Sequence, residues 1–224
     1  MKARSTALCL ALLALLATPA ASPAVAGREE LHYRWRLGNL LGVLAGLFFP
    51  DAGDGVLSFE PQGDGTVRSE LLITSEESRD GEYFRYGSVV DRARGRTLSA
   101  WSSYSWRGEQ KSRHGEIEGE GVVDIASGIF LLRHDTSDKP RMMEIWSEGR
   151  LYPVVVIPLG PETRTVAGRK VPTRHLSVRG VEQRGKRFWK GRLDLWLACD
   201  EAATPVEIRI ERKRLGVHLV LEPG

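Results

Sequence analysis

A chain of 224 residues is long enough for one domain with a substantial hydrophobic core. Its contents of 42% hydrophobic and 27% charged residues are ordinary for a globular protein, and its 24 glycines suit a chain with many turns. The formal net charge is only +3, and the presence of just two cysteines excludes a disulfide-stapled scaffold, so stability must come from packing.

The N-terminal segment 1–26 has the three parts of a secretory signal peptide. Met1–Arg4 is basic, Ala7–Ala17 is apolar, and Ala24–Ala26 offers small residues for cleavage. The apolar run is well short of the ~20 residues of a membrane-spanning helix. Cys9 lies inside this run rather than at its end, so no lipid anchor is expected. We therefore predict a periplasmic or secreted protein with one mature domain over residues 27–224.

Charge is divided unevenly along the predicted mature chain. Residues 169–214 contain 13 Lys and Arg against 6 Asp and Glu, whereas residues 27–168 contain 17 against 22. The basic part suits anionic lipid headgroups or an acidic polysaccharide, while nucleic acid is not expected as a partner outside the cytoplasm. The alternative is that these charges only solvate the outward faces of strands.

The first predicted strand is Leu31–Leu37, in which apolar and polar side chains alternate strictly. The apolar segment 38–54 follows, and its glycines at a spacing of four share one face if it is helical. It is too short to span a bilayer. Three alternatives stay open: a buried helix, a membrane-surface segment, and a lid over a cavity, for which the candidate contacts are Leu44, Leu47 and Phe48.

Turn signals at Asp54-Gly55, Asp64-Gly65 and Asp80-Gly81 separate the next segments. Runs rich in β-branched, leucine and aromatic residues predict strands. These runs are Val56–Glu60, Thr66–Ser75, Glu82–Asp91, Thr97–Arg107, Met142–Trp146, Leu151–Ile157, Thr163–Val166, Val171–Val181 and Arg187–Cys199. Pro153 and Pro158 indicate an edge or a bulge in the strand that holds them. Residues 122–133 break the β pattern and predict a short helix that Asp124 caps.

The C-terminal stretch Gly191–Gly224 reads as three antiparallel strands with two short turns. Leu193, Leu195, Leu197 and Cys199 share a face that matches the apolar face of Leu31–Leu37, so we expect the two ends of the chain to pair and close the sheet. Cys199 is most simply a small buried strand residue. A nucleophilic role is the alternative, although no activating pattern surrounds it.

These elements predict a mainly β protein, built as a single strongly curved antiparallel sheet or open β-barrel of about 10–12 strands. One or two short helices would cover its concave face. No repeat or linker divides the mature chain into further domains.

The sequence lacks familiar catalytic and cofactor motifs, so no catalytic residue, metal or cofactor is predicted. His114, Glu116, Glu118 and Glu120 alternate along one strand, about 6–7 Å apart, which chelates an ion poorly without a second strand. Their spacing overlaps that of paired glycosidase carboxylates. A solvated strand face is the simpler interpretation.

Other polar and aromatic residues are weaker candidates for a site. His134, Asp135 and Asp138 lie in a polar stretch that is simply explained as a loop. His32, His175 and His218 are isolated in the sequence, and only folding could bring them together. Trp101 and Trp196 lie on the more polar faces of their strands, where they either stack on sugars, anchor at a lipid interface, or cover cross-strand neighbours.

Several short patterns resemble the bacterial domain-of-unknown-function family 3108 over about residues 31–222, most strongly from residue 122 onward. They are Leu31-x-Tyr33, Val123-Asp124-Ile125-x-Ser127, Leu132-Arg133, Gly149-Arg150-x-Tyr152-x-Val154, Leu195-Trp196-Leu197-x-x-Asp200, Thr204-Pro205-Val206-x-Ile208 and Leu215-Gly216-Val217. The resemblance implies an exported envelope protein but no catalytic residues, and the segment 38–54 is longer and more apolar than the corresponding hairpin of that family. The fold is also similar, by analogy alone, to the open-barrel lipoprotein carriers of the periplasm.

The sequence therefore favours a non-enzymatic periplasmic protein that binds a lipid-like or other apolar ligand, and that touches the membrane only peripherally. The predicted lining of the cavity is Tyr33, Trp35, Leu195, Leu197, Ile208 and Ile210. One alternative is an enzyme that acts on envelope polysaccharide through Glu116, Glu118 or Asp200. Another is a structural or assembly partner whose concavity is filled by its own side chains.

Overall fold

A computed structural model describes residues 27–37, 52–75, 81–106, 108–212 and 215–223. In these ranges two strand meanders are joined through the helix α2 (Ile125–Arg133). The first comprises β1 (Glu29–Leu37), β2 (Ala52–Pro61), β3 (Thr66–Ser75), β4 (Tyr83–Asp91), β5 (Arg96–Trp106) and β6 (Glu109–Glu116). The short β7 (Val122–Val123) precedes the helix. The second comprises β8 (Arg141–Ser147), β9 (Arg150–Val166), β10 (Arg169–Gly180), β11 (Gly191–Ala198), β12 (Pro205–Arg212) and β13 (Leu215–Leu221).

All these strands belong to one sheet of 13 strands, in the order β6-β5-β4-β3-β2-β1-β13-β12-β11-β10-β9-β8-β7. Neighbouring strands are antiparallel except β7 and β8, which are parallel. The sheet is not closed, since β6 and β7 are its two edges. The predicted fold class, a mainly β protein built on one large antiparallel sheet, is therefore confirmed.

The two ends of the chain pair with each other, as the sequence predicts. Strand β1 runs antiparallel to β13, with Tyr33 opposite Leu221 and Leu37 opposite Val217. This pairing does not close the sheet, however, because β1 and β13 occupy its middle rather than its edges. The expected closure was therefore wrong, although the expected pairing was right.

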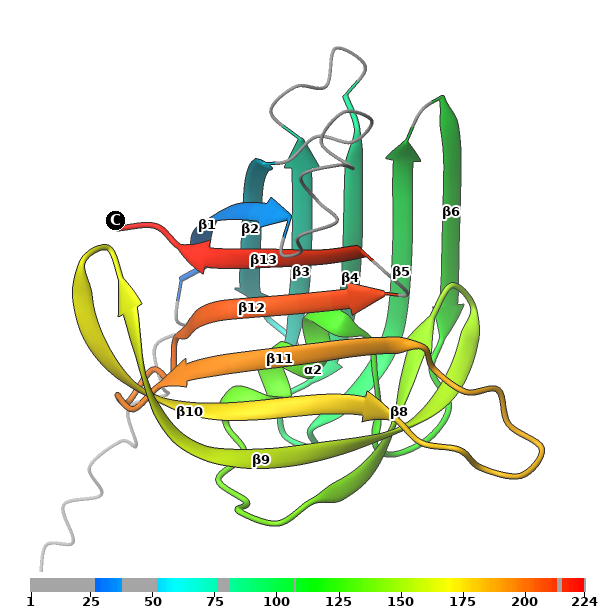
Figure 1. The fold of residues 1–224 in the computed structure, drawn as a ribbon. Coiled ribbons are helices and arrows are strands. Elements are labelled where there is room, and N and C mark those ends of the chain that lie inside the picture. Colours follow the sequence, from blue (N-terminus) through cyan, green and yellow to red (C-terminus); the bar gives the residue numbers. More distant parts are fainter. Residues whose placement is uncertain (1–26, 38–51, 76–80, 107, 213–214, 224) are drawn as a thin grey trace, which may run out of the picture.

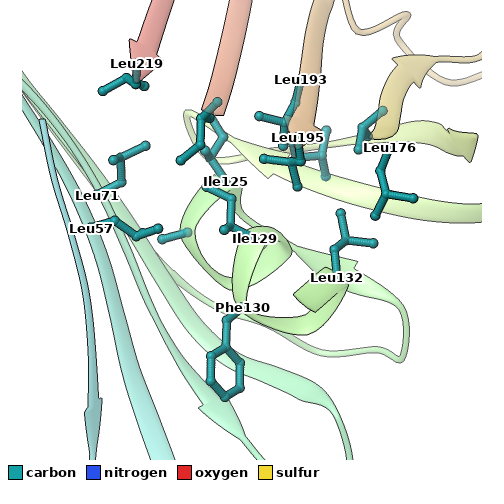
Figure 2. Packing of buried hydrophobic residues seen from close by; sticks show 14 of the residues in the cluster. Leu57, Leu71, Ile125, Ile129, Phe130, Leu132, Leu176, Leu193, Leu195 and Leu219 are labelled. Carbon is teal, nitrogen blue, oxygen red and sulfur yellow. The ribbon is translucent and has the colours of Figure 1, made fainter. Parts of the chain in front are cut away.

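The sheet curls over on itself, so that β9 to β12 cross in front of the strands of the first meander, with α2 between them (Figure 1). The hydrophobic core fills this space. Figure 2 shows side chains of both halves and of the helix directed into it, among them Leu57, Leu71, Ile129, Leu193 and Leu195. All five of these side chains are almost completely buried.

Helix α2 begins where the sequence places a cap. Asp124 Oδ1 accepts hydrogen bonds from the Ser127 backbone N–H at 2.8 Å and from its hydroxyl at 2.7 Å, and the Ser127 hydroxyl oxygen accepts one from the Asp124 N–H at 2.9 Å. This reciprocal arrangement satisfies N–H groups that a helix N-terminus leaves free. Within the described ranges, no helix is long and apolar enough to cross a membrane.

The two edges of the sheet lie near each other in space, without strand pairing between them in the described part of the chain. Trp146 of β8 packs against Gly115 of β6, where an added Cβ would lie 3.3 Å from the indole Nε1. Trp146 is buried there together with Ala100, Ile117 and Val122. The fold is therefore an open barrel whose edges meet through side chains.

Three local expectations need correction or refinement. Asp54-Gly55 is not a turn but part of β2. Cys199 is exposed, because β11 ends at Ala198 and the cysteine lies in the turn that follows. Strand β9 is not at an edge, and the register shifts where Leu176 pairs with Pro158, which makes this proline part of a bulge. The predicted lid residues Leu44, Leu47 and Phe48 lie outside the described residues.

Candidate ligand-binding site

The inner face of β4 and β5 has a covered end and an open end. At the covered end Ser88, Val90 and Thr97 are completely buried, and the Thr97 hydroxyl donates to the Ser127 hydroxyl of α2 at 3.2 Å. Toward the other end the same face continues with the pairs Tyr86–Ser102 and Phe84–Tyr104, which are only partly buried. Among the described residues, the helix thus covers one end of the concavity and leaves the other end partly exposed.

Aromatic rings line the open end. Phe84 lies 5.9 Å from Tyr104 and 5.6 Å from Trp106, measured between ring centroids. A hollow of about 190 Å³ lies against this cluster. Its lining residues are Phe84, Tyr86, Ser102, Ser103, Tyr104 and Glu148. Such a surface offers apolar contact together with hydroxyl groups at its margin.

A second hollow, of about 390 Å³, lies between β6 and the turn that joins β8 to β9. Its lining residues are Lys111, Arg113, Glu148, Gly149 and Arg150. Antiparallel pairing places Lys111 opposite Tyr104 and Arg113 opposite Ser102. Directly paired residues share a face of the sheet. Because Glu148 also lines the aromatic hollow, the two hollows adjoin and form one site.

The site carries an excess of positive charge. No ion pair joins Lys111, Arg113 or Arg150 to a carboxylate of the described residues, and Arg113 donates a hydrogen bond to the backbone oxygen of Ser112. On the acidic side, Glu148 lines both hollows, and Glu109 accepts a hydrogen bond from the Tyr104 hydroxyl at 3.0 Å. Three cations beside an aromatic surface suit a ligand with an apolar part and an anionic group.

The residues predicted to line a cavity lie deeper, in the packed core. Tyr33, Leu195, Leu197 and Ile208 are 0% exposed and Trp35 is 5% exposed, while Ile210 packs against the same cluster. The Tyr33 hydroxyl donates to the Pro205 carbonyl at 2.6 Å. In the described part of the chain, these side chains support the two halves of the sheet on each other.

The predicted acidic candidates lie on separate exposed elements. Glu116 ends β6, Glu118 follows it, and Asp200 belongs to the β11–β12 turn, where its carboxylate accepts a hydrogen bond from the Thr204 N–H at 3.4 Å. No group of three or more His, Cys, Asp or Glu residues in the described ranges could hold a metal ion. Among the described residues, Glu148 is the one acidic residue that lines either hollow, so they place no pair of facing carboxylates there.

Two of the isolated histidines meet a polar network on the outer face of β9 to β13. His175 stacks on Trp196 at 4.2 Å, and the Trp196 indole donates to Glu162 at 2.6 Å. Trp196 therefore belongs to a buried polar network rather than to a free stacking platform.

A second part of this network is centred on Glu207. Arg164 donates hydrogen bonds to both carboxylate oxygens of Glu207 at 2.5 Å. His218 also contacts Glu207, whereas His32 pairs with Glu30 on β1.

This outer network predicts that the protein loses stability in acid. Burial raises the pKa of Glu207, but hydrogen bonds from His218 and Arg164 outweigh it, and the net pKa is lowered. Burial lowers the pKa of His175. Both groups therefore bind protons more readily in the unfolded chain. Each group contributes its full stability above its pKa in the unfolded chain, which is about 4.3 for Glu and 6.5 for His. This contribution is lost as the pH falls through the lower pKa that the group has in the folded protein.

The measurement is the thermal unfolding midpoint across the range from about pH 7 to pH 3. The midpoint should fall with pH, and below about pH 4.3 the Glu207→Gln variant should show a shallower slope because the carboxyl group that binds protons in this range is gone. A midpoint that is constant over this range, or an unchanged slope in the variant, would contradict the assignment.

Comparisons with known proteins agree with the fold. No protein-family model and no curated protein matches the chain. Its structure resembles the crystal structure of a β-barrel-like protein of domain of unknown function DUF1849 from Brucella abortus, with a TM-score of 0.53 and 8% identity, over 88% of this chain and 96% of that one. At this identity the likeness concerns the fold alone.

Two further similarities are weaker. The hypothetical lipoprotein YmcC from Escherichia coli has a TM-score of 0.36 and 13% identity, over 87% of both chains. LprF from Mycobacterium bovis has a TM-score of 0.30 and 15% identity, over 88% of this chain and 85% of that one. Neither adds to what the first comparison shows.

Proposed function

We propose that the protein is a non-enzymatic binding protein of the bacterial cell envelope that holds an amphipathic, anionic, lipid-like ligand at the open end of its concave face. The apolar part of the ligand lies against Phe84, Tyr104 and Trp106. Its anionic group lies near Lys111, Arg113 and Arg150.

One observation carries this proposal: an aromatic hollow and a basic hollow adjoin at Glu148 on the concave face of an open barrel. Ligand sites typically combine apolar walls with a few polar groups that orient the ligand. The aromatic rings provide the first and the cations the second. Glu148 is the one carboxylate that lines either hollow in the described part of the chain, and this arrangement supports binding over acid–base hydrolysis.

The envelope location rests on the N-terminal segment. A basic start, a short apolar run and a small-residue cleavage site direct a chain to export. The resemblance to domain-of-unknown-function family 3108, whose members are typically exported, agrees with this location, and we propose membership of that family on the same patterns. An envelope protein meets lipids and acidic polymers, so an anionic amphiphile is a ligand available there.

Binding of cis-parinaric acid, a fluorescent fatty acid, tests the site. The Lys111→Gln, Arg113→Gln double variant should bind the probe about tenfold more weakly, because two charged partners of its carboxylate are lost. The methyl ester of the probe should bind more weakly to the unaltered protein and should be insensitive to the double variant.

The matched control is the Arg169→Gln, Lys170→Gln variant, which removes the same charge from exposed positions at the start of β10. Its affinity for the probe should equal that of the unaltered protein. If the unaltered protein does not bind the probe, or if both double variants lose affinity equally, the proposed site is wrong.

A further inference from the structure

The connection between β10 and β11, residues 181–190, is a basic loop that projects from the body of the protein (Figure 1). From Arg179 to Arg192 the sequence contains 6 Lys and Arg and a single acidic residue, Glu182. Arg184, Arg187 and Lys190 are exposed. No ion pair joins these three side chains to a carboxylate in the described part of the chain, so their charge is directed at solvent.

Trp189, the neighbour of the exposed Phe188, holds the loop in place. Trp189 is only 8% exposed and belongs to the main hydrophobic core, whereas Phe188 is 46% exposed. The backbone at Trp189 rests on Gly180, where an added Cβ would lie 2.1 Å from the Trp189 carbonyl oxygen. The buried indole thus anchors the loop to the core, and Phe188 is presented to solvent beside it.

Strands β8 and β9, which the loop contacts, carry further exposed apolar side chains. Lys186 pairs with Glu144 of β8. On the same outward face of β8 and β9, Met142 is 58% exposed and Leu151 is 42% exposed. With Phe188 they make up three of the four large hydrophobic side chains that are exposed in the described residues, the fourth being Leu159.

We propose that the loop 181–190, together with Met142 and Leu151, docks the protein on the surface of an anionic lipid membrane. Basic side chains are attracted to anionic headgroups, and an aromatic or aliphatic side chain beside them enters the interfacial layer. Charge complementarity therefore selects the occupant, because Phe188 lies in a loop whose exposed side chains include Arg184, Arg187 and Lys190. An apolar protein partner would not need these cations.

This docking surface goes beyond the proposed ligand site and does not depend on it. The two are nonetheless close in the chain, because Leu151 follows Arg150, which lines the basic hollow. A docked protein would therefore present the open end of its concave face near the lipid layer. Ligand exchange with the membrane would then not require passage through water.

The test is co-sedimentation of the mature protein, residues 27–224, with vesicles of phosphatidylcholine, and with vesicles in which part of this lipid is replaced with phosphatidylglycerol. The protein should bind the anionic vesicles, and added salt should weaken binding. The Arg184→Gln, Arg187→Gln variant should partition roughly 20-fold more weakly. Phe188→Ser should weaken partition by about tenfold.

Two control variants distinguish a specific effect of the loop on vesicle binding from an effect of net charge or of exposed hydrophobic surface. Arg169→Gln, Lys170→Gln removes the same charge elsewhere, and Leu159→Ser removes an exposed apolar side chain of similar exposure, 47%. Both should bind vesicles within about twofold of the unaltered protein. The fatty-acid affinity of the loop variants should be unchanged, so failure of docking and failure of the ligand site give different results.

Three outcomes would overturn the docking proposal. They are absence of binding to anionic vesicles, equal losses in the loop variants and the controls, and binding to a soluble acidic polysaccharide but not to vesicles. Thermal unfolding midpoints equal to that of the unaltered protein would show that the loop variants are folded, which is expected because Trp189 is retained.

Discussion

Replacement of Gly53 with alanine is expected to destabilise the protein by about 3 kcal/mol or more. A Cβ at this position of β2 would lie 2.0 Å from the Thr74 carbonyl oxygen and 2.5 Å from Trp35 Nε1. The first contact is with backbone, so relief requires β2 to separate from β3. The second breaks the hydrogen bond from Trp35 Nε1 to the same oxygen, which measures 2.7 Å. The thermal unfolding midpoint should fall by roughly 10 °C.

The matched control is Gly63→Ala in the β2–β3 turn, where an added Cβ would have no neighbour within 4 Å. Its unfolding free energy in urea should stay within about 0.5 kcal/mol of the unaltered protein. Equal behaviour of the two variants would mean that the close approach of Trp35 to Gly53 does not constrain the sheet.

Replacement of Arg133 with methionine is expected to cost about 3 kcal/mol. The Arg133 side chain is 5% exposed and makes a two-pronged ion pair with Glu29 of β1, at 2.8 and 2.9 Å. It also donates to the Ala202 carbonyl in the β11–β12 turn at 2.8 Å, and its guanidinium lies 4.9 Å from the Phe59 ring centroid. Methionine keeps the apolar packing but leaves the Glu29 carboxylate and the Ala202 carbonyl without this donor.

Urea unfolding measures this loss, and Arg94→Met provides the control. Arg94 pairs with Asp91 at 3.3 Å, but its side chain is 77% exposed, so the change should cost at most about 0.5 kcal/mol. Arg133→Lys should recover only part of the stability, since an ammonium group cannot reproduce the two-pronged geometry. A loss at Arg133 no larger than at Arg94 would refute the assigned role.

The sequence predicted the large elements of the fold well because their patterns are local. Strict alternation identified β1, and the capping residue Asp124 identified the start of α2. The pair Asp54-Gly55 was misinterpreted because glycine serves two purposes. Here it does not adopt a positive φ in a turn but leaves room for neighbouring side chains, as an added Cβ at Gly55 would lie 2.3 Å from Leu219. Leu219 comes from the far end of the chain, which no local pattern reveals.

The candidate site was beyond local patterns for a similar reason. Phe84 and Tyr104 belong to different strands, and Arg150 comes from a later hairpin, so only the register and the curl of the sheet bring them together. The one available signal was the alternation of Lys111 and Arg113 along a strand that otherwise reads as polar and exposed. The apolar residues chosen instead, such as Leu195 and Ile208, are those that a packed core also requires.

The central pairing of β1 with β13 has a kinetic consequence. Within each meander, strands pair with their neighbours in the sequence, whereas the seam between the meanders pairs residues 33–37 with residues 217–221. Such a topology has high contact order, and folding must wait for this most distant contact. Strand β13 completes the middle of the sheet, so β1 lacks one of its two neighbouring strands until the chain through residue 221 is available for pairing.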